Sequence, residues 1–181
     1  MNGTKARLNR WLSSEPPFEE YLRLGMQVGE HCRIQPGVVF DYSHCWLIEI
    51  GNEVTIAPQA YLLAHDASTK AWSGYTRIGR VVIEDGAFIG ARAVIMPGVT
   101  VGHHSIIAAG SIVTKSVPPN SVFGGNPAKE ICTMAAYREK CESEMREMPL
   151  YDSSYTLSGG ITDREKREMQ EALMQGRGFV V

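Results

Sequence analysis

Residues 83–118 read IEDGAF IGARAV IMPGVT VGHHSI IAAGSI VTKSVP, with a branched aliphatic residue at the first position of each group of six. This period continues without a break from Ile83 to Val113. An α-helix turns once every ~3.6 residues, so residues spaced by six would spread around its surface and form no single apolar stripe. The stretch is therefore not helical, and we interpret it as short strands that alternate with turns.

A second set of positions supports this interpretation. Four residues after each aliphatic residue, the side chain is small or of modest size: Ala87, Ala93, Val99, Ser105, Ser111 and Val117. We expect the aliphatic side chain to point into a core, the smaller one to fit the corner beside it, and glycine to adopt the dihedral angles of the turn. Three flat faces of this kind make one triangular coil, and coils stack through parallel ladders. The predicted fold class is all-β, a parallel β-helix.

The repeat also divides the chain. It begins less regularly near residue 28, is offset by four extra residues at 46–49, and fails at 64–77, where we expect a loop that projects from the coil. We predict an N-terminal helical cap at 1–27, with a short helix at 16–24, a β-helix domain at 28–131, and a C-terminal helical tail at 132–181. In the tail we expect one helix at 133–148 and a second, ending near Gly176, that begins at a capping box of Thr162 and Glu165.

Composition excludes several classes of partner. The formal net charge is −2 and 21% of the residues are charged, which argues against binding to nucleic acid or to an anionic membrane. No apolar stretch reaches the ~20 residues that span a bilayer, and the N-terminal segment lacks the apolar run of a signal peptide, so we expect a cytoplasmic protein. The cysteines form no CxxC pair and have no close histidine, so we expect reduced thiols and neither a disulfide framework nor a zinc site.

The run IGARAVIMPGVTVGHHSIIAAGSIVTKSVPPNSVFGGNPAKEI, residues 89–131, resembles the hexapeptide-repeat acetyltransferases. It is similar in particular to the galactoside and maltose O-acetyltransferases and to polysaccharide O-acetyltransferases. The segments AAGSIVTK and GNPAK, with a Pro-Pro turn between them, are more specific than the repeat alone. The resemblance implies a left-handed β-helix, acetyl-CoA as co-substrate, a sugar or glycan as acceptor, and a homotrimer with active sites between subunits.

Acetyl transfer to a hydroxyl requires a base that titrates near neutral pH, for which imidazole is suited, and donors for the oxyanion of a tetrahedral intermediate. Among the five histidines, His65 alone stands where a coil gives way to the long loop. In the enzymes that this chain resembles, the catalytic histidine occupies this junction, upstream of an aromatic position matched here by Phe88. We predict that His65 is the general base; the alternative is a histidine of a surface loop.

Residues around the first coils are candidates for the acceptor site. His44 falls where a small inward residue is expected, and with Asp41, Tyr42 and Asp66 it could line an acceptor site beside His65; the alternative is a local irregularity of the coil. The adjacent His103 and His104 lie on a turn, where we expect them to face solvent or a neighbouring subunit; the alternative is that one of them contacts a ligand.

The donor site is assigned from the resemblance alone. In this family acetyl-CoA lies in a groove between coils of adjacent subunits. The residues of this chain that match positions along that groove are Phe88, Ala91, Ala109, Thr114, Lys115 and Lys129. The lysines match positions near the nucleotide end, where a cation would pair with phosphate; the alternative is a solvated surface charge.

One departure from the family concerns the group that orients the catalytic imidazole. Several relatives use a loop carboxylate, but between Asp66 and Glu84 this sequence has none. We expect Asp66, a backbone carbonyl or a residue of a partner chain to take this role.

Three other functions compete with O-acetylation. γ-Type carbonic anhydrases share the coil but bind metal through histidines that include an HxxxxH pair, which is missing here, so we expect no metal requirement. A non-catalytic trimeric scaffold would need no intact site. An N-acetyltransferase acting on an amino sugar or sugar nucleotide would need a base as well, and the sequence leaves this last alternative open.

Overall fold

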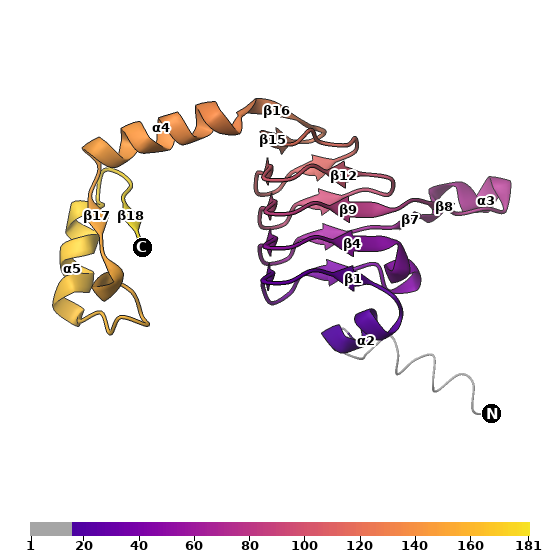
Figure 1. Cartoon of the computed structure of the whole chain (residues 1–181), viewed down its shortest axis with the longest axis horizontal. Coiled ribbons are helices and arrows are strands. Elements are labelled where there is room, and N and C mark those ends of the chain that lie inside the picture. The colour runs from indigo at the N-terminus through magenta and orange to yellow at the C-terminus, as the bar shows by residue number, and fades with distance from the viewer. Residues whose placement is uncertain (1–15) are drawn as a thin grey trace. The chain divides into compact units, whose positions relative to one another are not determined.

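Short parallel strands stacked in three sheets form the first part of the chain (Figure 1). The computed structural model describes residues 16–181. The β1 sheet contains β1 (Gln27–Val28), β4 (Ile48–Ile50), β9 (Val81–Ile83) and β12 (Thr100–Val101). The β2 sheet contains β2 (Arg33–Ile34), β5 (Thr55–Ile56), β10 (Phe88–Ile89), β13 (Ile106–Ile107), β15 (Ser121–Gly125) and the antiparallel β16 (Ala128–Thr133). The β3 sheet contains β3 (Val39–Phe40), β6 (Tyr61–Leu62), β11 (Val94–Ile95) and β14 (Ile112–Val113).

The strands stack in a register that places like residues above one another. Ile56 pairs with Ile34 on one side and Ile89 on the other, and Ile89 pairs in turn with Ile107. The six aliphatic residues that define the repeat are at most 1% exposed: Ile83, Ile89, Ile95, Val101, Ile107 and Val113. The smaller residues of the second set are buried beside them. The predicted β-helix and its core are therefore confirmed.

Two kinds of glycine occupy the turns of the repeat. Gly86, Gly98 and Gly110 have φ between 66° and 83°, a region that favours glycine. Gly90 lacks such an angle, but a side chain there would meet the backbone nitrogen of Ala109 in the next coil at 2.5 Å. Glycine is therefore required at position 90 by the close approach of two coils, and not by the unusual dihedral angles that we predicted for the turn glycines.

Irregular segments interrupt the stack between the β3 sheet and the β1 sheet. The 3₁₀ segment η1 (Tyr42–Leu47) separates β3 from β4, so the inserted residues lie slightly earlier than the predicted 46–49. An arm made of β7 (His65–Asp66), η2 (Ala67–Thr69), α3 (Lys70–Ser73) and β8 (Arg77–Ile78) projects from the stack (Figure 1). β7 and β8 pair in antiparallel fashion, with His65 opposite Ile78. The projecting loop predicted at 64–77 is thus a hairpin with a helical tip.

Helix α2 (Phe18–Arg23) lies beside the first coil (Figure 1). Its Tyr21 is 5% exposed, and the ring packs edge-on against Phe40 with the ring centroids 5.5 Å apart. A short helix was predicted at this place. The remainder of the predicted cap, residues 1–15, lies outside the described residues.

The chain divides after Met134, and the second unit is Ala135–Val181. We expected the division at 131, but β16 continues the β2 sheet to Thr133. The tail contains α4 (Met134–Glu147), η3 (Ser153–Tyr155) and α5 (Asp163–Ala172), and the predicted capping box of Thr162 and Glu165 is present. The parallel pair β17 (Leu150–Tyr151) and β18 (Phe179–Val180) was not predicted, and α5 ends earlier than expected. Within residues 16–181, no helix has the length and apolar character needed to cross a membrane.

Candidate active site

His65 stands at the point where the β-helix opens into the arm. It follows β6 and the fully buried Ala64, and it is the first residue of β7. Its side chain is 31% exposed. A rigid coil therefore holds the backbone of His65 while part of the imidazole remains open to a ligand.

Asp41 lies directly against His65. It follows β3, which pairs with β6 so that Phe40 is opposite Leu62, and this register brings Asp41 to the same corner one coil earlier. Asp41 is 2% exposed, and its Oδ2 atom contacts Nδ1 of His65 and accepts a hydrogen bond of 3.0 Å from the backbone N–H of Ala64. Its Oδ1 atom accepts a hydrogen bond of 2.8 Å from the hydroxyl of Ser43.

These contacts fix the charge of Asp41. Burial by itself raises the pKa of the Asp41 carboxyl, but the hydrogen bonds from His65, Ser43 and Ala64 outweigh burial and hold that pKa below its usual value. An ionised carboxylate offers only lone pairs, so the proton between the two groups belongs to Nδ1 of His65. The lone pair of the neutral imidazole is then on Nε2, which can accept a proton from a ligand.

The carboxylate beside His65 is therefore Asp41, which was not among the three candidates that we named: Asp66, a backbone carbonyl or a residue of a partner chain. Asp66 accepts a hydrogen bond of 2.8 Å from the N–H of Ser68 and forms an ion pair of 2.5 Å with Arg77. Those contacts tie the two strands of the arm together. The hydrogen bond from Ser68 is the main cause that lowers the pKa of the Asp66 carboxyl, and Arg77 adds to it.

His44 completes a cluster with His65 and Asp41. The ring centroids of the two histidines are 5.1 Å apart, and Ser43 Oγ lies 3.0 Å from Nδ1 of His44 and 3.2 Å from Nδ1 of His65. One atom each from Asp41, His44 and His65 lies within 4.8 Å of the others, and this is the only group of three or more potential metal ligands among residues 16–181. His44 has the dihedral angles φ −141° and ψ 32° inside η1, which interrupt the 3₁₀ segment.

Tyr42, predicted with this group, contacts a different element. Its hydroxyl donates a hydrogen bond of 3.5 Å to Glu20, and its ring packs edge-on against Tyr21 at 5.8 Å, both residues of α2. Asp41 and His44 are thus brought to His65, whereas the contacts of Tyr42 and Asp66 lead to α2 and to the arm.

The residues predicted for the donor lie on several parts of the β-helix. Phe88 is 41% exposed on the outer face of β10. Ala91 and Ala109 occupy the turn between the β2 and β3 sheets in successive coils, where the N–H of Gly110 donates to the carbonyl of Ala91 over 2.8 Å. Lys129 is exposed on β16, at the end of the stack.

Thr114 and Lys115 follow β14, at the corner where the chain passes from the β3 sheet to the β1 sheet. Both are exposed. His65 occupies the corresponding corner in an earlier coil, after β6. Thr114 and Asp66 line the same cleft of about 390 Å³, together with Arg77 and Met96. Within one chain, Thr114 thus lies near the arm. Ala91 and Ala109 lie at the other end of the β3-sheet strands, at the corner with the β2 sheet.

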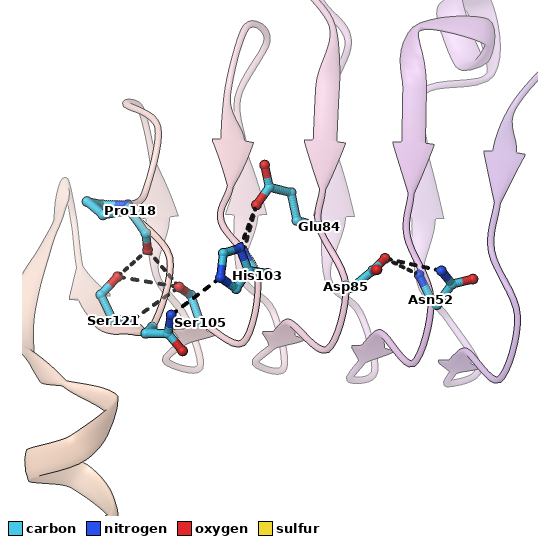
Figure 2. Close-up of polar contacts among 8 residues, drawn as sticks. Asn52, Glu84, Asp85, His103, Ser105, Pro118 and Ser121 are labelled. Carbon is cyan, nitrogen blue, oxygen red and sulfur yellow. Dashed lines mark hydrogen bonds and ion pairs between the residues drawn. The ribbon is translucent and has the colours of Figure 1, made fainter.

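The remaining histidines lie apart from this cluster. His103 and His104 are exposed on the turn between the β1 and β2 sheets, as expected, and Nδ1 of His103 lies 3.4 Å from Glu84 (Figure 2). Nearby, buried Ser105 and Ser121 both donate to the carbonyl of Pro118, at 2.7 Å and 2.6 Å (Figure 2). These bonds satisfy the polar groups of the corner. The four cysteines are free thiols.

Sequence reasoning missed two features of the cluster. The role of Asp41 at His65 could have been found from the spacing of Phe40 and Leu62, because stacked coils place the residues after them at one corner. Ser43 carries no signal in the sequence, since a serine in an irregular turn is common.

Comparisons with known proteins agree with this architecture. The family model of the bacterial transferase hexapeptide (six repeats) matches residues 80–115. Protein CapG of Staphylococcus aureus is 40% identical over 123 residues, which cover 65% of this chain and 72% of CapG.

Two solved structures extend the likeness. A maltose O-acetyltransferase from Clostridium difficile 630 has 29% identity and a TM-score of 0.51, over 67% of this chain and 78% of that enzyme. A galactoside acetyltransferase in complex with coenzyme A also has 29% identity and a TM-score of 0.51, over 75% of this chain and 80% of that enzyme. The repeat, the stacked sheets and these relatives together assign the chain to the hexapeptide-repeat acetyltransferase family.

Proposed function

We propose that the chain transfers an acetyl group from acetyl-CoA to a hydroxyl group of a sugar or glycan, with His65 as general base. The observation that carries this proposal is the contact of the buried Asp41 carboxylate with Nδ1 of His65. Asp41 is a positioning residue: it fixes the tautomer that leaves Nε2 free, and it stabilises the imidazolium that forms during the reaction. The maltose and galactoside enzymes named above support a sugar acceptor, and the bound coenzyme A of the latter supports acetyl-CoA as donor.

The reaction balances without a further reagent. Nε2 of His65 takes the proton of the acceptor hydroxyl as its oxygen attacks the thioester carbonyl carbon, which forms a C–O bond and a tetrahedral oxyanion. Backbone N–H groups of nearby turns are suitable donors for that oxyanion. The intermediate collapses, the C–S bond breaks, and the imidazolium returns the proton to the departing CoA thiolate.

We further propose that the active unit is a homotrimer in which acetyl-CoA lies between subunits. Ala91 and Ala109 lie before the strands of the β3 sheet, and His65 lies after them, so the two sets occupy different corners of the β-helix. A donor molecule that contacts both sets is therefore more simply bound between two chains than by one. In that groove Phe88 would line the donor, Thr114 and Lys115 would lie near its nucleotide end, and Lys129 would pair with phosphate. His44 would face the acceptor beside His65.

A panel of acceptors tests this function. Purified full chain is incubated with acetyl-CoA and simple sugars, amino sugars or sugar nucleotides, and free thiol is measured over time. We expect thiol release with at least one sugar hydroxyl acceptor, and mass spectrometry should identify an ester that is cleaved by mild base. An amide product would replace O-acetylation by N-acetylation, and the absence of acetyl-CoA binding by calorimetry would favour the scaffold.

A further inference from the structure

Asp41, His44 and His65 present the ligand set of a transition-metal site. Two imidazole nitrogens and one carboxylate oxygen lie within 4.8 Å of one another. Zn²⁺ and Co²⁺ are bound in proteins by nitrogen and oxygen ligands of these types, with one or more positions left for water. We propose that these three side chains bind a divalent transition-metal cation of the Zn²⁺ class, and that the bound cation switches the transferase off.

The position of Ser43 marks where the cation fits. Its hydroxyl oxygen lies 2.8 Å from Asp41 Oδ1, 3.0 Å from His44 Nδ1 and 3.2 Å from His65 Nδ1. One small polar atom is therefore within hydrogen-bond distance of all three ligand residues. Rotation of the Ser43 side chain would open this space to a cation. The hydroxyl oxygen of Ser43 would still be near enough to serve as a further weak ligand.

The geometry requires two adjustments: the contacting atoms Asp41 Oδ2 and His65 Nδ1 must move apart, and the more distant ligand atoms must move closer. Ligand atoms around a tetrahedral Zn²⁺ stand about 3.4 Å apart, given bonds of about 2.1 Å. The first adjustment belongs to the side chains of Asp41 and His65, whose hydrogen bond is lost as the cation replaces the proton between them, and the second belongs to His44. His44 lies in an irregular 3₁₀ segment and its ring is partly exposed, which leaves it room to move.

The chemistry of the ligands also favours a cation here. The carboxyl group of Asp41 is buried beside His65, and divalent transition metals bind carboxylate oxygens and neutral imidazole nitrogens. A second cluster of similar composition contains Glu84, Asp85, His103 and His104 on two successive turns between the β1 and β2 sheets; Figure 2 labels the first three of these residues. The cluster does not bring three ligand atoms together among residues 16–181. These turns therefore supply a matched control of the same residue types.

Inhibition follows from the tautomer of His65. A cation on Nδ1 takes the position of the proton that Asp41 now accepts, and the remaining ring proton then resides on Nε2. Nε2 can no longer accept a proton from the acceptor hydroxyl. This inhibitory part rests on the proposed function, whereas the binding of metal does not.

Binding is tested with the metal alone. Full chain, freed of metal by chelation and kept reduced, is titrated with Zn²⁺ by calorimetry and with Co²⁺ by visible absorption. We expect about one cation per chain with a d–d spectrum of nitrogen and oxygen ligands. His44→Gln should raise the Kd by at least about tenfold, because loss of even an indirect ligand contact costs this much. His103→Ala should leave the Kd unchanged.

The outcomes separate the two proposals. If His44→Gln binds Zn²⁺ as tightly as the native chain, or if His103→Ala abolishes binding, the metal site is refuted. In each protein the rate at each zinc concentration is then expressed relative to that protein's own zinc-free rate. The zinc concentration that halves the rate should be higher in His44→Gln than in the native chain, in parallel with the Kd. A chain that binds one Zn²⁺ through His44 but never releases thiol keeps the metal site and overturns the proposed transferase.

Discussion

Replacing Asp41 by asparagine removes one negative charge from the site while keeping the shape of the side chain. The amide oxygen can occupy the place of Oδ2, where it accepts from the N–H of Ala64 and from Nδ1 of His65, and the amide nitrogen can donate to Ser43. Geometry and tautomer are then kept. The specific loss is the charge that stabilises the imidazolium of His65.

The size of this loss can be worked from the contacts. A hydrogen bond to a charged group contributes about 1.5–3 kcal/mol and one between neutral groups about 0.5–1.5 kcal/mol, so the change costs about 1–1.5 kcal/mol in the transition state. This corresponds to roughly a tenfold fall in kcat. Asp41→Ala should be worse, because it also leaves the buried N–H of Ala64 unpaired and frees the imidazole to rotate. We expect a fall of about a hundredfold or more for that variant.

Steady-state thiol release gives kcat and KM for each variant, with unfolding measured in parallel. KM for acetyl-CoA should remain unchanged in Asp41→Asn. If Asp41 acts through His65, Asp41→Asn should cause no further loss in a chain that already carries His65→Ala. Glu84→Gln, which alters a carboxylate–imidazole contact at the distant turn, is the control and should retain full activity. An Asp41→Asn enzyme with native kcat, or a full additional loss in the double variant, would refute this reasoning.

Three further predictions concern stability. Ile95→Ala should lower the free energy of unfolding of the β-helix by about 2–5 kcal/mol, as judged by urea denaturation, because Ile95 is fully buried between β6 and β14. Because the pKa of Asp41 is lower in the folded chain than in the unfolded one, its contribution to stability is complete above about pH 5 and declines as the pH falls through the folded pKa. Urea midpoints between about pH 5 and 3 should therefore fall more steeply in the native chain than in Asp41→Asn. Thr162→Ala should destabilise α5 by about 1 kcal/mol through loss of the capping box, which hydrogen exchange in that helix would report.

The β-helix was predictable because its signal is local. Each coil repeats the same order of inward aliphatic residue, small residue and turn, so six-residue spacing alone identified the buried positions from Ile83 to Val113. The capping box of Thr162 was predictable for the same reason, since its two residues are three apart. The pair β17–β18 joins short segments far apart in the sequence, and neither segment has a repeat that would reveal it.

The candidate site was predictable only in part. The break in the repeat indicated His65 and the irregular first coils indicated Asp41 and His44, three residues that the structure brings together. We did not connect Asp41 with His65, because their contact becomes apparent only when β3 is paired with β6 across the irregular segment η1. Asp66, one of the three groups that we considered for this role, instead forms an ion pair with Arg77 of the arm.

The most direct test of His65 as general base is the rate of thiol release from acetyl-CoA by His65→Ala, measured with the best acceptor of the native chain. We predict a fall in kcat of about a hundredfold to ten-thousandfold, with unchanged unfolding temperature, oligomeric state and affinity for acetyl-CoA. Turnover by His65→Ala at close to the native rate would contradict the assignment of His65 as the base.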